Sequence, residues 1–279
     1  MAENKDLPGK LPYGKAITLT YALNKWETWK FFELYGLPFA STYVIGESGG
    51  IEGFKAFVEM HGFPLIAKPI EGFASKGVFY IRSWEDAEII FTYEKYMFQE
   101  YLGNAASLDG YFKQMDGLTP LFAHAPNIFH HSCHTVIAPD GSFDPIFISR
   151  NDHESGVTIG FKKVENQILE ELTIKLVKAV IIEGGYGPIT VQFREDRNGN
   201  WKAQEINMRT NGNTFPRFTM GQDDLGLIMK GVLPDLNFPV YNAPEENKSL
   251  LIGKTLASKI MLPQNIFQLQ NDSFWNINS

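Results

Sequence analysis

One predicted hairpin carries three side chains whose oxygen atoms could bind the same cation. Its two strands, ITVQFRED and WKAQEINMR, flank Asn198-Gly199, the pair that a two-residue type I′ turn prefers. A turn at these residues fixes the register and places Gln192 directly opposite Glu205. Because side chains alternate along a strand, Asn207 then points to the same face as Glu205 and Gln192. The spacing therefore predicts that three oxygen ligands converge.

The chemistry of this predicted ligand set suits Mg²⁺ or Mn²⁺. Oxygen ligands with only one formal negative charge are typical of a cation that also takes phosphate oxygens, whereas zinc and iron sites favour nitrogen or sulfur ligands. A polar hairpin face that merely contacts water is the alternative, and on spacing alone it is at least as common. The same register pairs Arg197 with Asn200. It turns Val191 and Ile206 to the opposite face, toward a core.

A loop of small residues lies between two predicted strands, 63–69 and 77–83. In this loop, EGFASKG (71–77), the glycines would let backbone N–H groups close over phosphate oxygens, although many glycine-containing hairpin loops look the same. Lys68, near the end of the first strand, could reach a phosphate as a point charge or could be an ordinary surface charge. The segment is therefore a candidate phosphate site.

The segment HHSCH (130–134) invites a zinc interpretation that strand geometry opposes. Alternation puts His130 and His134 on one face and His131 and Cys133 on the other, so these side chains would not converge. Cys133 beside histidines could be a nucleophile, but a lone cysteine is more often a small buried hydrophobe.

Length and composition bound the class of protein. The 279 residues are enough for a substantial core, and 44% hydrophobic with 20% charged residues is typical of a globular protein. A net charge of −7 argues against nucleic acid as an obligate partner, because a phosphate backbone needs a basic surface. The sequence shows no segment with the length of a membrane span or the apolar core of a signal peptide. We therefore expect a cytoplasmic protein with no nucleic-acid or membrane partner.

Periodicity and stop signals predict the elements that must position these residues. Asn24 followed by Glu27 has the spacing of a capping box and predicts a helix that Gly36 and Pro38 end. Further helices are predicted over 51–61, 83–96 and 165–183. Their expected buried faces are Ile51, Phe54 and Val58 in the second helix, and Ile168, Leu172, Leu176 and Ala179 in the last.

Strands and hairpins alternate with these helices without the strand–helix–strand rhythm of a doubly wound sheet. The segment 97–102 indicates another strand, and 133–149 indicates two strands joined around Asp140-Gly141. An α+β fold of antiparallel sheets with helices packed on them fits best.

Five motifs, in order along the chain, resemble those of ATP-grasp enzymes. They are the first helix NKWETWKFFELYGLPF (24–39), a lysine–proline strand followed by a glycine-rich loop (FPLIAKPIEGFASKGV, 63–78), the hinge MFQEYL (97–102) and the metal-binding end VQF…QEINMRTNG (191–212). The resemblance covers roughly residues 20–220. The most similar subgroup contains the carbamoyl-phosphate synthetase large subunit and the carboxylate–amine ligases.

The resemblance implies the ATP-grasp fold, in which two α+β subdomains with antiparallel sheets grip ATP between them. It implies an N-terminal extension at 1–23 and an ATP-grasp domain at 24–279, with a smaller lid-like subdomain at about 63–102 and a C-terminal catalytic subdomain at 103–279. The N-terminal domain that usually precedes the first helix is expected to be missing. A homodimer or a separate chain would then supply that part.

Carried over position by position, the resemblance also implies a role for each motif residue. The phosphate-binding residues would be Lys25, Lys68, Gly72, Ser75, Lys76 and Gly77. The adenine-binding hinge would be Gln99, Glu100, Tyr101 and Leu102, and the magnesium ligands would be Gln192, Glu205 and Asn207. Arg209 would stabilise the transferred phosphoryl group or an acyl phosphate, with Arg150 as a second candidate.

One departure from the family concerns the ribose of the nucleotide. The family usually has an acidic residue after the hinge, but GNAASLDG (103–110) offers no obvious equivalent. Asp109 or His130 would have to substitute.

The implied reaction is activation of a small-molecule carboxylate by ATP as an acyl phosphate, attack by an amine, and release of ADP and phosphate. Two alternatives stay open: an ATP-grasp enzyme that activates bicarbonate or transfers phosphate without making an amide, and a nucleotide-binding subunit that has lost catalysis. Missing metal ligands would mark such a subunit, whereas all three predicted ligands are present. The identity of the carboxylate and of the amine does not follow from the sequence.

Overall fold

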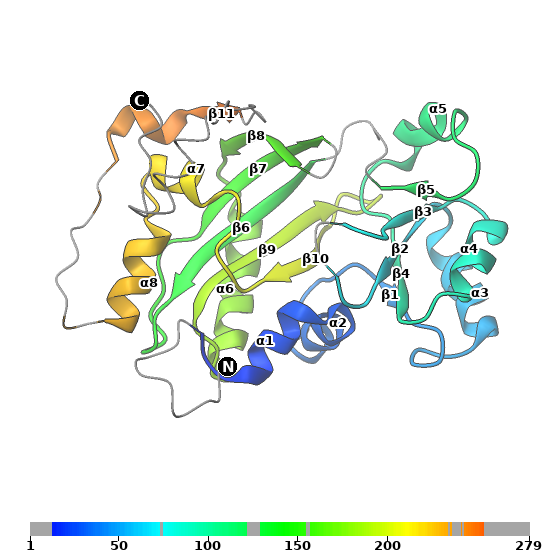
Figure 1. The fold of residues 1–279 in the computed structure, drawn as a ribbon, viewed down its shortest axis with the longest axis horizontal. Helices are drawn as coiled ribbons and strands as arrows, with labels where there is room; N and C mark the ends of the chain where they lie inside the picture. The colour runs from blue at the N-terminus through cyan, green and yellow to red at the C-terminus, as the bar shows by residue number, and fades with distance from the viewer. Residues whose placement is uncertain are drawn as a thin grey trace, which may run out of the picture.

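Two antiparallel sheets form the framework of the computed structural model, which describes residues 13–72, 75–121, 129–154, 157–233, 235, 241 and 243–253. The two sheets lie side by side in Figure 1, each with its own helices. This mixture of helices and antiparallel strands confirms the predicted α+β class.

The smaller sheet has five strands, in the order β1 (Thr42–Tyr43), β4 (Tyr96–Glu100), β2 (Leu65–Pro69), β3 (Phe79–Ile81) and β5 (Thr119–Pro120). Two helices, α3 (Ile51–His61) and α4 (Trp84–Phe91), pack on it. At the centre of their contact, the ring of Phe54 lies against those of Tyr43 and Phe98. Further along the chain, η1 (Ala105–Leu108) and α5 (Asp109–Phe112) lead toward β5.

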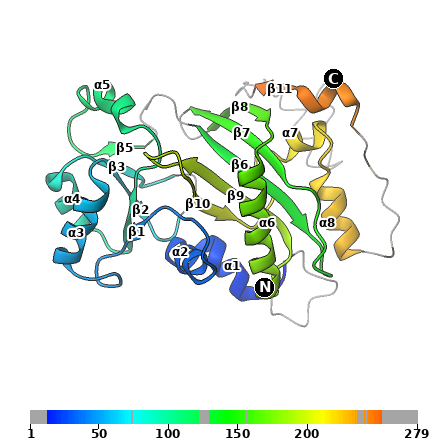
Figure 2. The ribbon, with the colours of Figure 1, turned by 180° about the vertical axis from the view of Figure 1, so that it is seen from behind.

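The larger sheet has six strands, in the order β10 (Trp201–Asn207), β9 (Gly187–Glu195), β6 (Phe129–Ile137), β7 (Phe147–Glu154), β8 (Val157–Lys163) and β11 (Leu251–Gly253). One face packs on α6 (Gln167–Ile182), with α1 (Ala16–Leu23) and α2 (Lys25–Leu34) beside it (Figure 2). On the other face, α7 (Thr214–Thr219) and α8 (Asp224–Val232) lie at one end, and η2 (Glu245–Ser249) lies beside β8.

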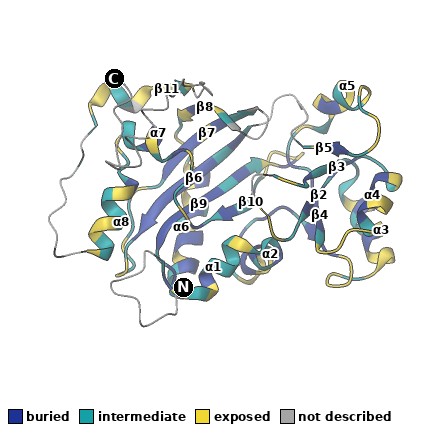
Figure 3. Cartoon of the chain, in the orientation of Figure 1, coloured by how far each residue is buried: buried dark blue, intermediate teal, exposed yellow. Residues whose placement is uncertain are grey.

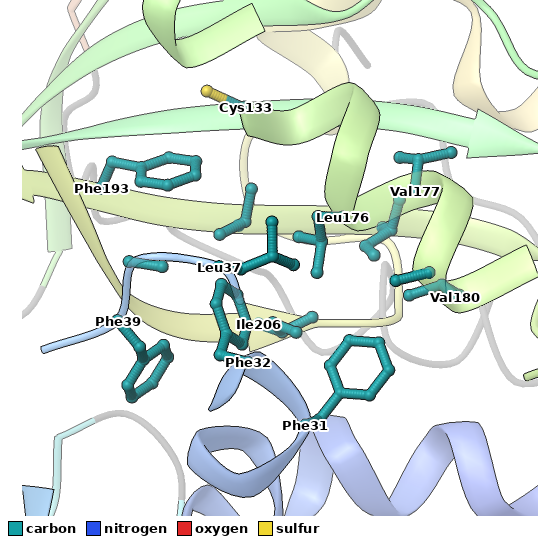
Figure 4. Close-up of a cluster of buried hydrophobic side chains, with 14 of the residues drawn as sticks. Phe31, Phe32, Leu37, Phe39, Cys133, Leu176, Val177, Val180, Phe193 and Ile206 are labelled. Carbon is teal, nitrogen blue, oxygen red and sulfur yellow. The ribbon is translucent and has the colours of Figure 1, made fainter. Parts of the chain in front are cut away.

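The core between the larger sheet and its helices receives the apolar face of the predicted hairpin. Phe193 of β9 and Ile206 of β10 pack with Leu176 of α6 and Phe32 of α2 (Figure 4). In Figure 3 the buried residues follow the strands, whereas exposed residues are concentrated on the outer surfaces of the helices. Because this face is buried, the alternate side chains, Gln192 among them, must point to the opposite face.

The predicted helices form, but the one predicted over 83–96 ends at Phe91, and two residues of the predicted buried faces are exposed. Asn24 caps α2, since its side chain accepts hydrogen bonds from the backbone N–H groups of Trp26 and Glu27 at 3.0 Å. Ile51 and Ile168, both predicted to be buried, are 43% and 58% exposed. In α6 the buried face instead includes Leu169 and Thr173, and the hydroxyl of Thr173 donates to the carbonyl of Leu169 at 2.6 Å. A buried threonine that satisfies its own hydroxyl in this way is invisible to a hydrophobic pattern.

The hairpin turn differs from the prediction. Arg197 does not pair with Asn200. The strand pair nearest the turn is instead Glu195 with Trp201. Asp196 closes the longer loop, and its Oδ1 accepts the backbone N–H group of Asn200 at 2.9 Å. An aspartate that binds nearby backbone N–H groups favours such a loop over the two-residue turn.

A β-bulge at Gln204 restores the predicted pairing on the metal-binding side. The longer loop shifts the register by one residue, so that Ala203 pairs with Phe193. The bulge shifts it back, and Glu205 pairs with Gln192 as predicted. The two irregularities therefore cancel, and the predicted face is correct although the predicted turn is wrong.

The described part of the segment 1–23 includes a helix, α1, which packs on α2. The backbone N–H group of Lys15, just before it, donates to the carbonyl of Gly184 at 3.1 Å. None of the helices in the described ranges is long and apolar enough to cross a bilayer.

Replacing Phe54 tests the core of the smaller sheet. The side chain is fully buried, so Phe54→Ala should lower the free energy of unfolding by about 3–5 kcal/mol. Ile51→Ala in the same helix removes an exposed side chain and should cost less than about 1 kcal/mol. Urea unfolding followed by circular dichroism measures both. Equal losses would contradict the assigned face of α3.

Candidate active site

A cavity of about 250 Å³ lies between the two sheets. Thirteen of the fifteen residues singled out from the sequence line it: Lys25, Lys68, Gly72, Ser75, Lys76, Gln99, Glu100, Tyr101, Leu102, Gln192, Glu205, Asn207 and Arg209. The other two, Gly77 and Arg150, do not line it. Segments from both sheets and from α2 therefore meet at one place.

Gln192, Glu205 and Asn207 share the hairpin face that turns away from the core. Glu205 pairs with Gln192 and Asn207 follows two residues later, whereas Ile206 between them is buried. Gln192 Oε1 accepts a hydrogen bond from Gln204 Nε2 at 3.3 Å. Two amides and one carboxylate form a donor set that suits Mg²⁺ sharing its remaining positions with phosphate and water.

Lys68 is held at the junction of the two sheets. Its Nζ donates to Gln99 Oε1 in the smaller sheet at 2.8 Å and to the backbone carbonyl of Gln204 in the larger sheet at 3.2 Å. Burial lowers the pKa of Lys68 to about 8, although the nearby charge of Glu205 acts in the opposite direction. A buried ammonium in this position would be stabilised by an anionic ligand.

Lys25, the first residue of α2, lies beside the glycine-rich loop. Its backbone N–H group donates to the carbonyl of Ile70 at 2.9 Å, and its Nζ donates to the carbonyl of Gly72 at 3.1 Å. Burial lowers the pKa of Lys25, whereas the carboxylates of Glu205 and Glu71 act to raise it. Two lysines from different elements thus interact with the same carboxylate, Glu205.

The described part of the glycine-rich loop turns through two left-handed residues. Ser75 and Gly77 have φ angles of 51° and 72°. A Cβ atom at Gly77 would lie 2.6 Å from the hydroxyl of Tyr96, which donates to the carbonyl of Gly77 at 2.9 Å. Glycine at this position therefore shapes the loop without lining the cavity. Phe73 and Ala74 lie outside the described residues.

The carboxylate of Glu100, at the predicted hinge, joins the two sheets. It accepts hydrogen bonds from Lys202 Nζ at 2.6 Å and from the backbone N–H group of Ser41 at 2.7 Å. Lys202 also lies 3.4 Å from Asp196, and His61 lies 3.7 Å from Glu100. The backbone N–H group of Glu100 is also engaged, since it donates to the carbonyl of Ser41 at 2.9 Å. What Glu100 can offer a ligand is therefore its backbone carbonyl.

The two predicted arginines lie on opposite faces of the larger sheet. Arg209 follows β10 and lines the cavity. Arg150 in β7 pairs with His131, whereas Ser132 pairs with Gln192, so alternation points Arg150 away from the face of Gln192. The prediction for Arg150 is therefore corrected. The strand was right and the face was wrong.

His130, rather than Asp109, lies at the cavity. Its ring stacks on that of His153, with centroids 4.4 Å apart. Burial, together with His153, keeps the pKa of His130 well below its ordinary value, so this ring is neutral at neutral pH. Cys133 points to the core face as predicted, and burial raises the pKa of its thiol to about 12.

None of the family models and none of the curated proteins compared with the chain matches it. Solved structures do match. The biotin carboxylase domain of Hydrogenobacter thermophilus 2-oxoglutarate carboxylase, solved with MgADP, ADP and bicarbonate, has a TM-score of 0.58 at 14% identity, covering 85% of this chain and 50% of that one. The carboxyaminoimidazole ribonucleotide synthase of Aspergillus clavatus, solved with ATP, has a TM-score of 0.56 at 15% identity, covering 80% and 54%.

A third match is the L-amino acid ligase of Bacillus licheniformis, with a TM-score of 0.51 at 13% identity, covering 77% of this chain and 48% of that one. All three are ATP-grasp enzymes. The chain has the ATP-grasp fold. It spans about half the length of the structures that it matches.

The ATP-grasp fold brings further residues to the cavity. Ile66 and Arg194 each lie two positions from a predicted residue on the same strand, Lys68 and Gln192, and line the cavity with it. Strand alternation alone would have found both. Other lining residues were given no role. Val78 and Gln204 lie within motifs that assign them none, and Leu121, Phe129 and His153 come from segments without a motif.

The amine of Lys68 should titrate well below an ordinary lysine. Because burial penalises its charged form, its proton should be lost with a midpoint near pH 8. The unfolded chain then binds more protons than the folded chain between about pH 8 and 10.5, so stability should rise with pH across that window relative to Lys68→Met. The ¹³Cε chemical shift reports the midpoint, with Lys68→Met assigning the signal. A midpoint near the ordinary value of 10.5 would contradict the burial assigned here.

Proposed function

We propose that the chain is an ATP- and Mg²⁺-dependent ligase that activates a carboxylate as an acyl phosphate for attack by an amine. The reaction would form an amide and release ADP and phosphate. One observation carries the proposal, the convergence in one cavity of three oxygen ligands with three cations: Gln192, Glu205 and Asn207 with Lys25, Lys68 and Arg209.

The cations would bind the triphosphate. Lys25 and Lys68 are positioned by the hydrogen bonds that they donate to Gly72 and Gln99, and burial lowers the pKa of both. Phosphate oxygens would supply the missing negative charge. The glycine-rich loop, with Gly72 and Ser75 at the cavity, would add backbone N–H groups.

Gln192, Glu205 and Asn207 would hold the magnesium ion, for which Mn²⁺ is an alternative. When bound, the ion would neutralise charge on the transferred phosphoryl group and orient it. In the protein itself, the charge of Glu205 interacts with Lys25 and Lys68. Binding of the metal ion together with the phosphates would therefore keep the charges of Glu205 and the two lysines balanced.

The nucleotide base would bind at the other part of the cavity, against the hinge. Ile66, Val78 and Leu102 supply apolar surface there, and the backbone of Glu100 and Leu102 would bond the polar edge of the base. The neutral ring of His130 would lie toward the ribose, in place of the acidic residue that the family usually has.

Phosphoryl transfer to a carboxylate needs no nucleophile from the protein. A carboxylate oxygen of the substrate would attack the γ-phosphorus as ADP leaves, and the amine would then attack the carbonyl carbon as phosphate leaves. Catalysis in such reactions consists mainly of positioning and charge neutralisation. Arg209, which is exposed at the cavity, would donate hydrogen bonds to the phosphoryl oxygens. Cys133 is unsuited to a nucleophilic role because it faces the core.

Bicarbonate is a second candidate for the activated carboxylate. The H. thermophilus domain with the same fold was solved with bicarbonate bound. Bicarbonate activation would use the same phosphate and metal residues, so the two reactions differ only in the acceptor. A nucleotide-binding subunit without catalysis is disfavoured because the three ligands and Arg209 are all present.

Glu205→Ala should abolish ADP formation. Loss of the only charged ligand should remove the metal and lower the rate by about 100-fold or more, since a metal supplies several kcal/mol in such reactions. ADP release from purified protein, measured across amino acids, short peptides, small carboxylates and bicarbonate, identifies the acceptor and checks the variant.

Glu195→Ala is the matched control. Glu195 lies on the same hairpin, pairs with Trp201, and does not line the cavity, so this variant should keep full activity. Full activity of Glu205→Ala would refute the metal assignment. Binding of ATP by the unaltered protein without turnover on any acceptor would favour the non-catalytic subunit.

A further inference from the structure

A closed ring of hydrogen bonds lies beside the candidate metal site. His134 Nδ1 is 2.8 Å from Thr190 Oγ1, and its Nε2 is 2.9 Å from Asp224 Oδ1. Arg217 donates from Nε and Nη2 to Asp224 Oδ2 at 2.9 and 2.5 Å. Its Nη1 donates to Asn211 Oδ1 at 3.2 Å, and Asn211 Nδ2 donates to Thr190 Oγ1 at 3.2 Å, which closes the ring.

One arrangement of protons satisfies every bond of the ring. The Asp224 carboxylate can only accept, so Nε2 of His134 carries the proton and Nδ1 accepts from the hydroxyl of Thr190. The oxygen of that hydroxyl is then available to the amide of Asn211. Burial lowers the pKa of His134. Burial alone would raise the pKa of Asp224, but the hydrogen bond from His134 and the charge of Arg217 lower it. A neutral histidine with one cation and one anion makes the ring neutral.

Burying the ring costs more desolvation free energy than burying apolar side chains in the same place would. Arg217, Asp224, His134 and Thr190 are each no more than 2% exposed. Desolvating a buried arginine–carboxylate pair offsets most of its attraction, so such pairs add little net stability and can instead specify one geometry. The position of the ring indicates which geometry is specified.

The ring holds both ends of the segment 207–211. Thr190 is the strand partner of Asn207, and Asn211 is two residues beyond Arg209. Asn211 Oδ1 also accepts the backbone N–H group of Asn213 at 2.9 Å, which fixes the following turn. Between these anchors, the side chain of Arg209 has one described hydrogen bond, from Nη1 to the carbonyl of its neighbour Thr210 at 3.3 Å.

We propose that the ring of His134, Thr190, Asn211, Arg217 and Asp224 is a positioning network that fixes the segment 207–211, so that Asn207 and Arg209 face the metal and the phosphoryl group. The inference rests on the proposed function of the cavity. It assigns α7 and α8, which carry Arg217 and Asp224, to support of the active site.

The test measures how much Mg²⁺ strengthens binding of AMP-PNP, a non-hydrolysable ATP analogue, and needs no acceptor. Isothermal titration calorimetry in Mg²⁺ and in EDTA gives this factor for each protein. Arg217→Met should reduce it by about tenfold or more, as expected when outer partners of metal ligands are lost. Binding in EDTA should fall less than binding in Mg²⁺, because the hinge and the two lysines are untouched and only the contact of Arg209 is weakened. Asn211→Ala, which leaves the Arg217–Asp224 pair intact, should give the same result if Arg217→Met fails to fold.

The matched control is Arg82→Met. It breaks a less buried arginine–aspartate pair, in which Arg82 Nε lies 3.0 Å from Asp86 Oδ2 beside the smaller sheet, and should lower the melting temperature without changing the magnesium factor.

Three outcomes would overturn the inference. Folded Asn211→Ala with an unchanged factor would show that the ring serves stability alone, and an equal loss in Arg82→Met would point to general destabilisation. Either result leaves the proposed function intact. Absence of any magnesium effect in the unaltered protein would instead refute the proposed function, and the inference with it.

Discussion

The pairing of β9 with β10 decides which side chains reach the cavity and which reach the core. A slip by one residue would bury Gln192 and Glu205 and turn Val191 and Ile206 outward, because the side-chain period of a strand is two. The loop that Asp196 closes and the bulge at Gln204 shift the register in opposite directions. The apolar contact with α6 and the polar wall of the cavity are therefore two results of one set of strand pairings.

Two sets of charged groups in this fold are balanced in different ways. Within the ring that includes Arg217 and Asp224, each nitrogen that donates has an acceptor and the charges cancel within the protein. In the cavity, Lys25 and Lys68 share one carboxylate, Glu205, and burial opposes the charge of both lysines. The first arrangement is complete without a ligand, whereas the second is completed by an anion and a cation together. This contrast separates the part of the larger sheet that holds geometry from the part that would bind nucleotide.

The sequence predicts most of the elements and most of the cavity residues, and the errors have physical causes. Gln192 and Glu205 were paired correctly through a turn that does not form, since the preference of Asn198-Gly199 for a tight turn is outweighed by the backbone hydrogen bonds of Asp196. The strand predicted for Arg150 is right but the face is wrong, because a resemblance identifies the strand more readily than the face of the sheet to which each of its side chains points. The ring around Arg217 left no signal at all. Its members come from three separate segments, and buried polar residues do not register in a hydrophobic pattern.

The cluster of Glu100, Lys202 and Asp196 also has a mechanical consequence. It links the end of β4 to the larger sheet, so a motion that separates the sheets at this end must break these partly buried charge pairs. In β2, Leu65 is the strand partner of Glu100, whereas Pro69, which leads into the glycine-rich loop, lies at the far end of the same pairing. This far end is tied as well, because Lys68 Nζ donates to the carbonyl of Gln204 and the backbone N–H group of Lys25 donates to the carbonyl of Ile70. Opening the cavity at the phosphate end would therefore break hydrogen bonds made by both lysines, so release of phosphate and separation of the sheets would be coupled.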